Sequence, residues 1–149
     1  MQPTTQEDWT PIAVGSHILN DGYDRALREA KAPGGPQLWL SRYCGYERTV
    51  LVGFHGAQTQ ICSGRHIPRF SELAPAFVDL GVKQIGAISY NDYEVLARWA
   101  EDTPLGAVDL LSDGNLAFAE RAGLLDDLTA EGMGFRVARF AMLVERGRV

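Results

Sequence analysis

The 149-residue chain has few cysteines, no long apolar run and no excess of basic residues. Two cysteines, Cys44 and Cys62, do not make a disulfide framework, so we expect a reducing, cytoplasmic environment. No apolar run approaches the ~20 residues that cross a bilayer. The first residues have neither a basic nor an apolar signal-peptide region, and no signal peptide is expected. The formal net charge of −5 argues against nucleic acid or an anionic membrane as the main partner.

What is present is the composition of an ordinary globular domain, with 46% hydrophobic and 22% charged residues. At this length, folding buries roughly 70% of the surface of the unfolded chain, which is enough for a core without disulfides. We therefore expect one domain over residues 1–149, with residues 1–10 as a flexible arm.

Short apolar runs alternate with helical patterns, which predicts an α/β fold with a mainly parallel core and an antiparallel hairpin at the end. The expected strands are residues 37–43, 50–54, 84–89, 108–112 and 137–145. The expected helices are residues 23–31, a helix that starts around Cys62, and residues 71–80, 93–102 and 116–124.

The chain stops at Val149, two residues after a turn at Arg146-Gly147. Little strand remains to pair with residues 140–145, and we expect a shortened C-terminal part of the fold. Either the edge is left exposed, or another chain covers it. Both alternatives stay open.

Residues 50–70 contain the main candidate for chemistry: a buried strand, a polar turn and a helix whose first turn carries Cys62. Thr59 stands at N-cap spacing from Cys62, so its hydroxyl oxygen is expected to accept the Cys62 N–H. The helix dipole lowers the pKa of a thiol placed there, which favours a nucleophilic thiolate. An inert buried cysteine is the alternative.

A second possibility is a zinc or copper site made by His55, Cys62 and His66. Cys62 and His66 are four residues apart and so share one face of a helix.

The same stretch reads HGAQTQICS, Gly64-Arg65 and HIPRF, and it resembles the peroxiredoxin motif PGAFTPTCS followed by HLPGF. Further along, ISYND resembles LSVND, and LLSDGNLAF resembles LLADPTGAF. GFRVARFAMLVERGRV resembles R-x-x-R-F/Y-A-M-V-V-x-x-G-x-V. From residue 50 to 149, the chain is therefore similar to the redoxin family, specifically to the peroxiredoxin 5 and plant type II subgroup. The residues that match the cysteine motif are Gly56, Ala57, Thr59, Cys62, Ser63, His66, Pro68 and Phe70.

This resemblance implies a thioredoxin-like fold, with a central mixed sheet flanked by helices, and reduction of hydroperoxides. Cys62 would attack the O–O bond and become a sulfenic acid. Thr59 would hydrogen-bond the thiolate and the substrate, and Arg139 would hold the sulfur anionic and polarise the peroxide. The alternative for Arg139 is a surface charge, and a surface charge is also our interpretation of Arg136. His66 is structural in the family, and no metal or cofactor is expected.

The chain departs from the family pattern in the turn, where His55 replaces a proline that shields the thiolate and fixes the loop. Gln58 and Gln60 replace an aromatic residue and a second proline, which predicts a more polar and less rigid turn. Slower peroxide reduction is one expected consequence.

No resolving cysteine stands at the positions that the family uses, and one of these is Ala87. Cys44 is expected to be a core filler. We expect a one-cysteine cycle with an external thiol such as thioredoxin, glutaredoxin or glutathione, and a homodimer. The alternative is a catalytically weak redox sensor or partner-binding module.

Overall fold

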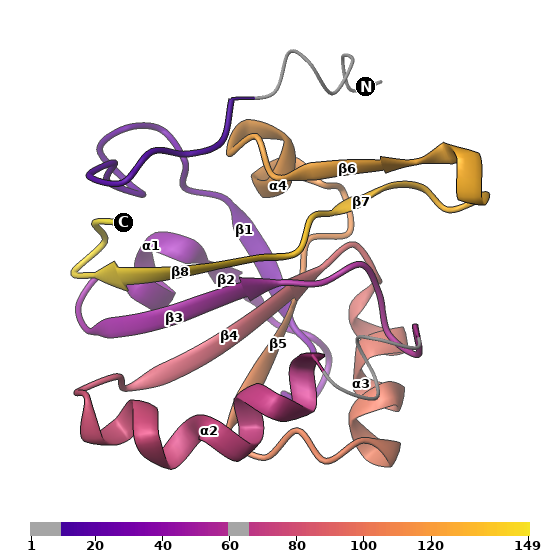
Figure 1. The fold of residues 1–149 in the computed structure, drawn as a ribbon, viewed down its shortest axis with the longest axis horizontal. Helices are drawn as coiled ribbons and strands as arrows, with labels where there is room; N and C mark the ends of the chain where they lie inside the picture. Colours follow the sequence, from indigo (N-terminus) through magenta and orange to yellow (C-terminus); the bar gives the residue numbers. More distant parts are fainter. Residues whose placement is uncertain (1–9, 60–65) are drawn as a thin grey trace.

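The computed structural model describes residues 10–59 and 66–149 (Figure 1). The expected arm at residues 1–10 lies outside the described residues except for Thr10, and Cys62 lies outside them as well. Within this part of the chain, no helix combines the length and the apolar character needed to cross a membrane.

The centre of the fold is a six-stranded mixed sheet with the order β2-β1-β5-β4-β3-β8. β3, β4 and β5 run parallel, whereas β1, β2 and β8 pair antiparallel to their neighbours. This arrangement confirms the mixed sheet expected for a thioredoxin-like fold. The strands are β1 (Ala26–Glu29), β2 (Gln37–Trp39), β3 (Arg48–Gly53), β4 (Gln84–Ser89), β5 (Val108–Ser112) and β8 (Phe140–Glu145).

Helices cover both faces of this sheet (Figure 1). Successive side chains of a strand point to opposite faces, so each strand contributes to two cores. Val50 and Val52 of β3 belong to the core under α2 and α3, whereas Leu51 belongs to the core under α1 and α4. The helices are α1 (Leu40–Cys44), α2 (Ile67–Asp79), α3 (Tyr93–Asp102) and α4 (Ala117–Arg121).

A separate two-stranded hairpin joins α4 to β8 (Figure 1). It consists of β6 (Leu125–Leu128), a short 3-10 turn (Thr129–Glu131) and β7 (Gly134–Val137). Leu125 and Val137 are register partners, and both are buried in the core under α1 and α4. The hairpin is therefore fixed to the body of the domain at its base.

Several expected elements are wrong or have other bounds. Residues 23–31 contain strand β1 instead of a helix, because Ala26–Glu29 pairs with β2 and with the end of β5. Residues 37–43 are divided between β2 and α1. No helix or strand was expected between residues 124 and 137, but the β6–β7 hairpin lies there, and the last strand starts at Phe140 instead of residue 137.

Helix α2 is one continuous helix with Pro75 inside it, although the sequence pattern suggested a break near residue 71. Its predicted stop is confirmed. Gly81 follows with φ +83°, and its N–H and that of Leu80 bond to carbonyls of the last turn.

Candidate active site

The candidate site lies where the parallel strands β3, β4 and β5 end, since ligands of open α/β sheets bind at the carboxyl edge. Residues 54–59 follow β3 and lead to Cys62; we call them the thiol loop. Tyr90 and Asn91 follow β4, and Asp113 follows β5. In this way, three segments far apart in sequence meet at one edge of the sheet.

The start of the thiol loop is held tightly. The Phe54 N–H donates to the Ile88 carbonyl at 3.0 Å, and the buried Phe54 ring lies 5.3 Å from the Trp99 ring. A Cβ on Gly53 would lie 2.3 Å from the Ala138 carbonyl oxygen, so only glycine allows this approach. The loop therefore leaves the sheet against the segment that enters β8.

Asn91 holds the middle of the loop. Its Oδ1 accepts the Ala57 N–H at 2.7 Å, and its backbone carbonyl accepts the Ser112 hydroxyl at 2.6 Å. The next residue, Asp92, caps α3 by accepting the Val95 N–H at 2.9 Å. Asn91 serves the thiol loop instead.

His55, which stands in place of the family proline, is anchored at two points. Its Nε2 lies 2.6 Å from Asp126 Oδ2 on β6, with side-chain exposures of 16% and 32%. An ionised carboxylate only accepts hydrogen bonds, so the imidazole nitrogen is the donor. The His55 carbonyl accepts from Arg136 Nη1 at 2.9 Å. Two contacts therefore hold residue 55. The less rigid turn expected from Gln58 and Gln60 stays a prediction.

Arg136 is a structural cation rather than a surface charge. It is part-buried, and its Nε donates to the Met133 carbonyl at 2.9 Å while Nη1 holds His55. Its guanidinium carbon lies 3.8 Å from the centre of the Tyr90 ring. Two carbonyls and an aromatic face compensate the partly desolvated charge, so the interpretation of Arg136 as a surface charge is wrong.

Thr59 closes the described part of the loop. Its hydroxyl donates to the Gly56 carbonyl at 2.9 Å, which leaves the oxygen able to accept a further hydrogen bond. The expected bond to the Cys62 N–H lies outside the described residues. The described helix begins at Ile67.

Arg139 is exposed and lies in the short connection between β7 and β8. Its neighbour Phe140 pairs in register with Gly53, directly before the thiol loop. No hydrogen bond or ion pair joins the Arg139 guanidinium to another residue within 10–59 or 66–149. Its position beside the loop is compatible with the expected role toward Cys62, and that role stays a prediction.

Cys44 is the second cysteine, and it is fully buried in the core under α1 and α4. Its Sγ donates to the Leu40 carbonyl at 3.0 Å. Burial raises the pKa of the Cys44 thiol to about 12, and the nearby Asp24 carboxylate adds to the rise. The expectation of a filler is confirmed, because this thiol is neither accessible nor ionised near neutral pH.

The two histidines of the possible zinc or copper site, His55 and His66, contact other residues. His55 is bonded to Asp126, and the His66 ring contacts the Phe70 ring edge-on at 5.7 Å. Among residues 10–59 and 66–149, no group of three or more metal-ligating side chains is present. Because Cys62 lies outside this part, the metal hypothesis itself stays untested.

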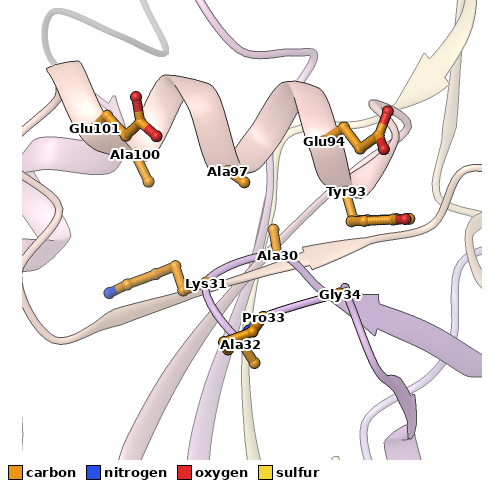
Figure 2. A pocket seen from close by; sticks show the side chains of 11 residues that line it. Ala30, Lys31, Ala32, Pro33, Gly34, Tyr93, Glu94, Ala97, Ala100 and Glu101 are labelled. Atoms are coloured by element: carbon orange, nitrogen blue, oxygen red, sulfur yellow. The ribbon is translucent and has the colours of Figure 1, made fainter.

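A hollow of about 560 Å³ lies between α3 and the loop of residues 30–35. Figure 2 shows Tyr93, Ala97 and Ala100 turned toward that loop, whereas the carboxylates of Glu94 and Glu101 turn away. None of the lining residues belongs to the thiol loop or contacts it through the hydrogen bonds described above. The hollow is therefore separate from the candidate site.

A mixed sheet with helices on both faces, and a cysteine that follows a loop at the carboxyl edge of its parallel strands, defines a thioredoxin-like protein. The comparisons with known proteins agree. The sequence profile of the Redoxin family matches residues 26–149. The chain is 34% identical to a peroxiredoxin of Synechocystis sp. over 145 residues, which cover 94% of this chain and 75% of the relative.

Two further relatives support the same assignment. The hybrid peroxiredoxin of Haemophilus influenzae is 41% identical over 103 residues, which are 68% of this chain but only 43% of that protein. The crystal structure of reduced Prx3 from Vibrio vulnificus in complex with H2O2 aligns with a TM-score of 0.83 and 29% identity. That alignment covers 93% of this chain and 81% of the other. The chain belongs to the redoxin family and, within it, to the peroxiredoxins, which are thiol-dependent peroxidases.

Proposed function

We propose that Cys62 performs peroxide reduction in this protein, in a one-cysteine cycle. The observation that carries the proposal is the environment of the two cysteines. Cys44 is sealed in the core with a raised pKa, whereas Cys62 follows a loop held at the carboxyl edge of the sheet. Cys62 is thus the thiol left to react.

In this cycle, the Cys62 thiolate attacks one peroxide oxygen. An S–O bond forms, the O–O bond breaks, and the leaving hydroxide or alkoxide takes up a proton to give water or an alcohol. Thr59 hydrogen-bonds the thiolate and the substrate, and the Arg139 guanidinium stabilises the negative charge on sulfur and on the leaving oxygen. An external thiol then forms a mixed disulfide with Cys62 and releases water. A second thiol attacks this mixed disulfide, which releases the disulfide of the two external thiols and restores the Cys62 thiol.

The proposed reductant is a small or protein thiol of the glutathione, glutaredoxin or thioredoxin kind. The proposed location is the cytoplasm, and the proposed assembly is a homodimer. The burial of Cys44 supports an external reductant, because a Cys44–Cys62 disulfide would require the core to open. No metal or cofactor takes part in this cycle.

The test is consumption of H2O2 and of an organic hydroperoxide with each thiol in turn, comparing wild type with Cys62→Ser. Cys44→Ala is the matched control. We expect Cys62→Ser to abolish turnover and Cys44→Ala to retain it. Turnover that survives Cys62→Ser would overturn the proposal. Stoichiometric oxidation of Cys62 without turnover with any of the thiols would indicate the redox-sensor alternative.

A further inference from the structure

We infer that the His55–Asp126 pair is a positioning device for the thiol loop, and that it takes over by contact what a proline at residue 55 achieves by covalent restraint. This inference rests on the proposed role of Cys62 as the reacting thiol. It assigns a function to two residues, one on the loop and one on a hairpin 71 positions away.

One face of the β6–β7 hairpin holds residue 55. Asp126 and Arg136 are register partners across β6 and β7, so their side chains point to the same face of the hairpin. Both contact the same loop residue. Asp126 binds the His55 imidazole at 2.6 Å, and Arg136 binds the His55 carbonyl at 2.9 Å. Residue 55 is therefore held through its side chain and its main chain at once.

The hairpin is anchored in the core. Leu125 and Val137, which neighbour this pair along the two strands, are buried in the core with exposures of 3% and 0%. The Arg136 guanidinium is further fixed between the Met133 carbonyl and the Tyr90 ring. Because this hairpin is fixed to the core, a loop residue that binds to it is held in place relative to the core.

The backbone of residue 55 differs between histidine and proline. A proline fixes φ through its ring and removes an N–H donor. Histidine leaves φ free, so the loop needs another restraint to hold one conformation. The His55 N–H makes no hydrogen bond to a residue within 10–59 or 66–149, so a proline at this position would remove no hydrogen bond to this part of the chain. The imidazole–carboxylate contact supplies the restraint that the ring would give.

Four variants and one control test this role. Asp126→Ala removes the acceptor, and Asp126→Asn keeps an amide oxygen that still accepts from Nε2. Asp127→Ala is the matched control, because it removes the next carboxylate on β6, which bonds to Thr129 instead. His55→Pro and the double variant His55→Pro/Asp126→Ala complete a cycle that isolates the coupling.

The readouts are the second-order rate of Cys62 oxidation by H2O2 and the hydrogen exchange of the thiol-loop peptide in the full chain. We expect Asp126→Ala to slow oxidation about tenfold, which corresponds to about 1.4 kcal/mol, and to speed exchange by a similar factor. Asp126→Asn restores most of the loss, and Asp127→Ala behaves as wild type. In the His55→Pro background, Asp126→Ala has no further effect on either readout.

Equal exchange and equal rates in Asp126→Ala and Asp127→Ala would overturn the inference, as would an Asp126→Ala effect that persists undiminished with His55→Pro. A wild type whose Cys62 does not react with peroxide would overturn the proposed function instead. Hydrogen exchange needs no peroxide, so it then decides alone whether the pair holds the loop.

Discussion

Asp126 and Arg136 face each other across the β6–β7 hairpin, and each binds a different part of His55. Through this relationship, a short hairpin outside the main sheet holds the loop that leads to Cys62. The hairpin therefore contributes to the site, although none of its residues follows the central strands β3, β4 or β5 directly.

Substitutions of the two arginines near the loop should have different effects: one on stability and the other on activity. Arg136→Ala leaves the carbonyls of His55 and Met133 without their donor and should lower the free energy of unfolding by about 1–3 kcal/mol. Arg136→Lys should not restore it, because one ammonium group cannot reach both carbonyls and also stack on Tyr90. Urea denaturation measures both.

Arg139→Ala is the counterpart. The side chain is exposed, so the free energy of unfolding should change by less than about 0.5 kcal/mol. Oxidation of Cys62 by H2O2 should slow by about 100-fold, the typical loss when a donor to a developing anion is removed. An Arg139→Ala protein that reacts as fast as wild type would exclude this arginine from the reaction.

The close approach at Gly56 should make the loop intolerant of a methyl group. A Cβ there would lie 2.8 Å from Arg136 Nη1 and 3.3 Å from Asn91 Oδ1, the two groups that hold the loop. Gly56→Ala should cost about 1–3 kcal/mol in the free energy of unfolding and slow Cys62 oxidation. Gly114→Ala is the control, since its nearest contacts would be 3.5 Å and 4.0 Å away. Similar losses in both variants would contradict the packing account.

The two cysteines should react with an alkylating reagent at very different rates. Only a thiolate reacts with iodoacetamide, and burial raises the pKa of the Cys44 thiol to about 12. In native protein we expect label on Cys62 alone, with Cys44 modified only after denaturation. Peptide mass spectrometry at several times measures this, and early labelling of Cys44 in folded protein would contradict its burial.

Asp113 should give the stability a defined pH dependence. Burial raises the pKa of this carboxyl above its ordinary value of 3.8, although N–H groups of Ala119 and Phe118 partly offset the rise. The folded state therefore binds the proton more tightly than the unfolded state. The contribution of Asp113 to stability falls as pH rises from about 4 through the folded-state pKa and is constant above it.

Asp113→Asn cannot ionise, so its free energy of unfolding relative to wild type should rise with pH across that window and then level off. Asp127 provides a control of opposite sign. The hydroxyl and N–H of Thr129 lower the pKa of Asp127, so its stabilising contribution is present above the unfolded pKa and is lost on acidification. The free energy of unfolding of Asp127→Asn minus that of wild type should therefore fall as pH rises. Denaturation at a series of pH values measures both, and parallel trends for the two variants would refute these assignments.

Much of the central sheet could be predicted, because local sequence patterns indicate its strands. The run VLVGF is continuously apolar, as is typical of a strand covered on both faces, and most of it lies in β3. QIGAIS and VDLLS are mostly apolar and form β4 and β5. The position of α3 was also predictable from the Asp92 cap. By contrast, YDRALREAK contains good helix formers, yet Ala26–Glu29 is a strand because β2 and β5 offer partners on either side.

The sequence by itself determined the α/β class, the family and the identity of the reacting thiol as a prediction, since these rest on residues close together in the chain. Only the tertiary structure decided how the thiol loop is held. The bonds of His55 to Asp126 and Arg136 and that of Ala57 to Asn91 join residues 34 to 81 positions apart. Such contacts exist only once the sheet brings its carboxyl edge and the hairpin together, and no local pattern encodes them.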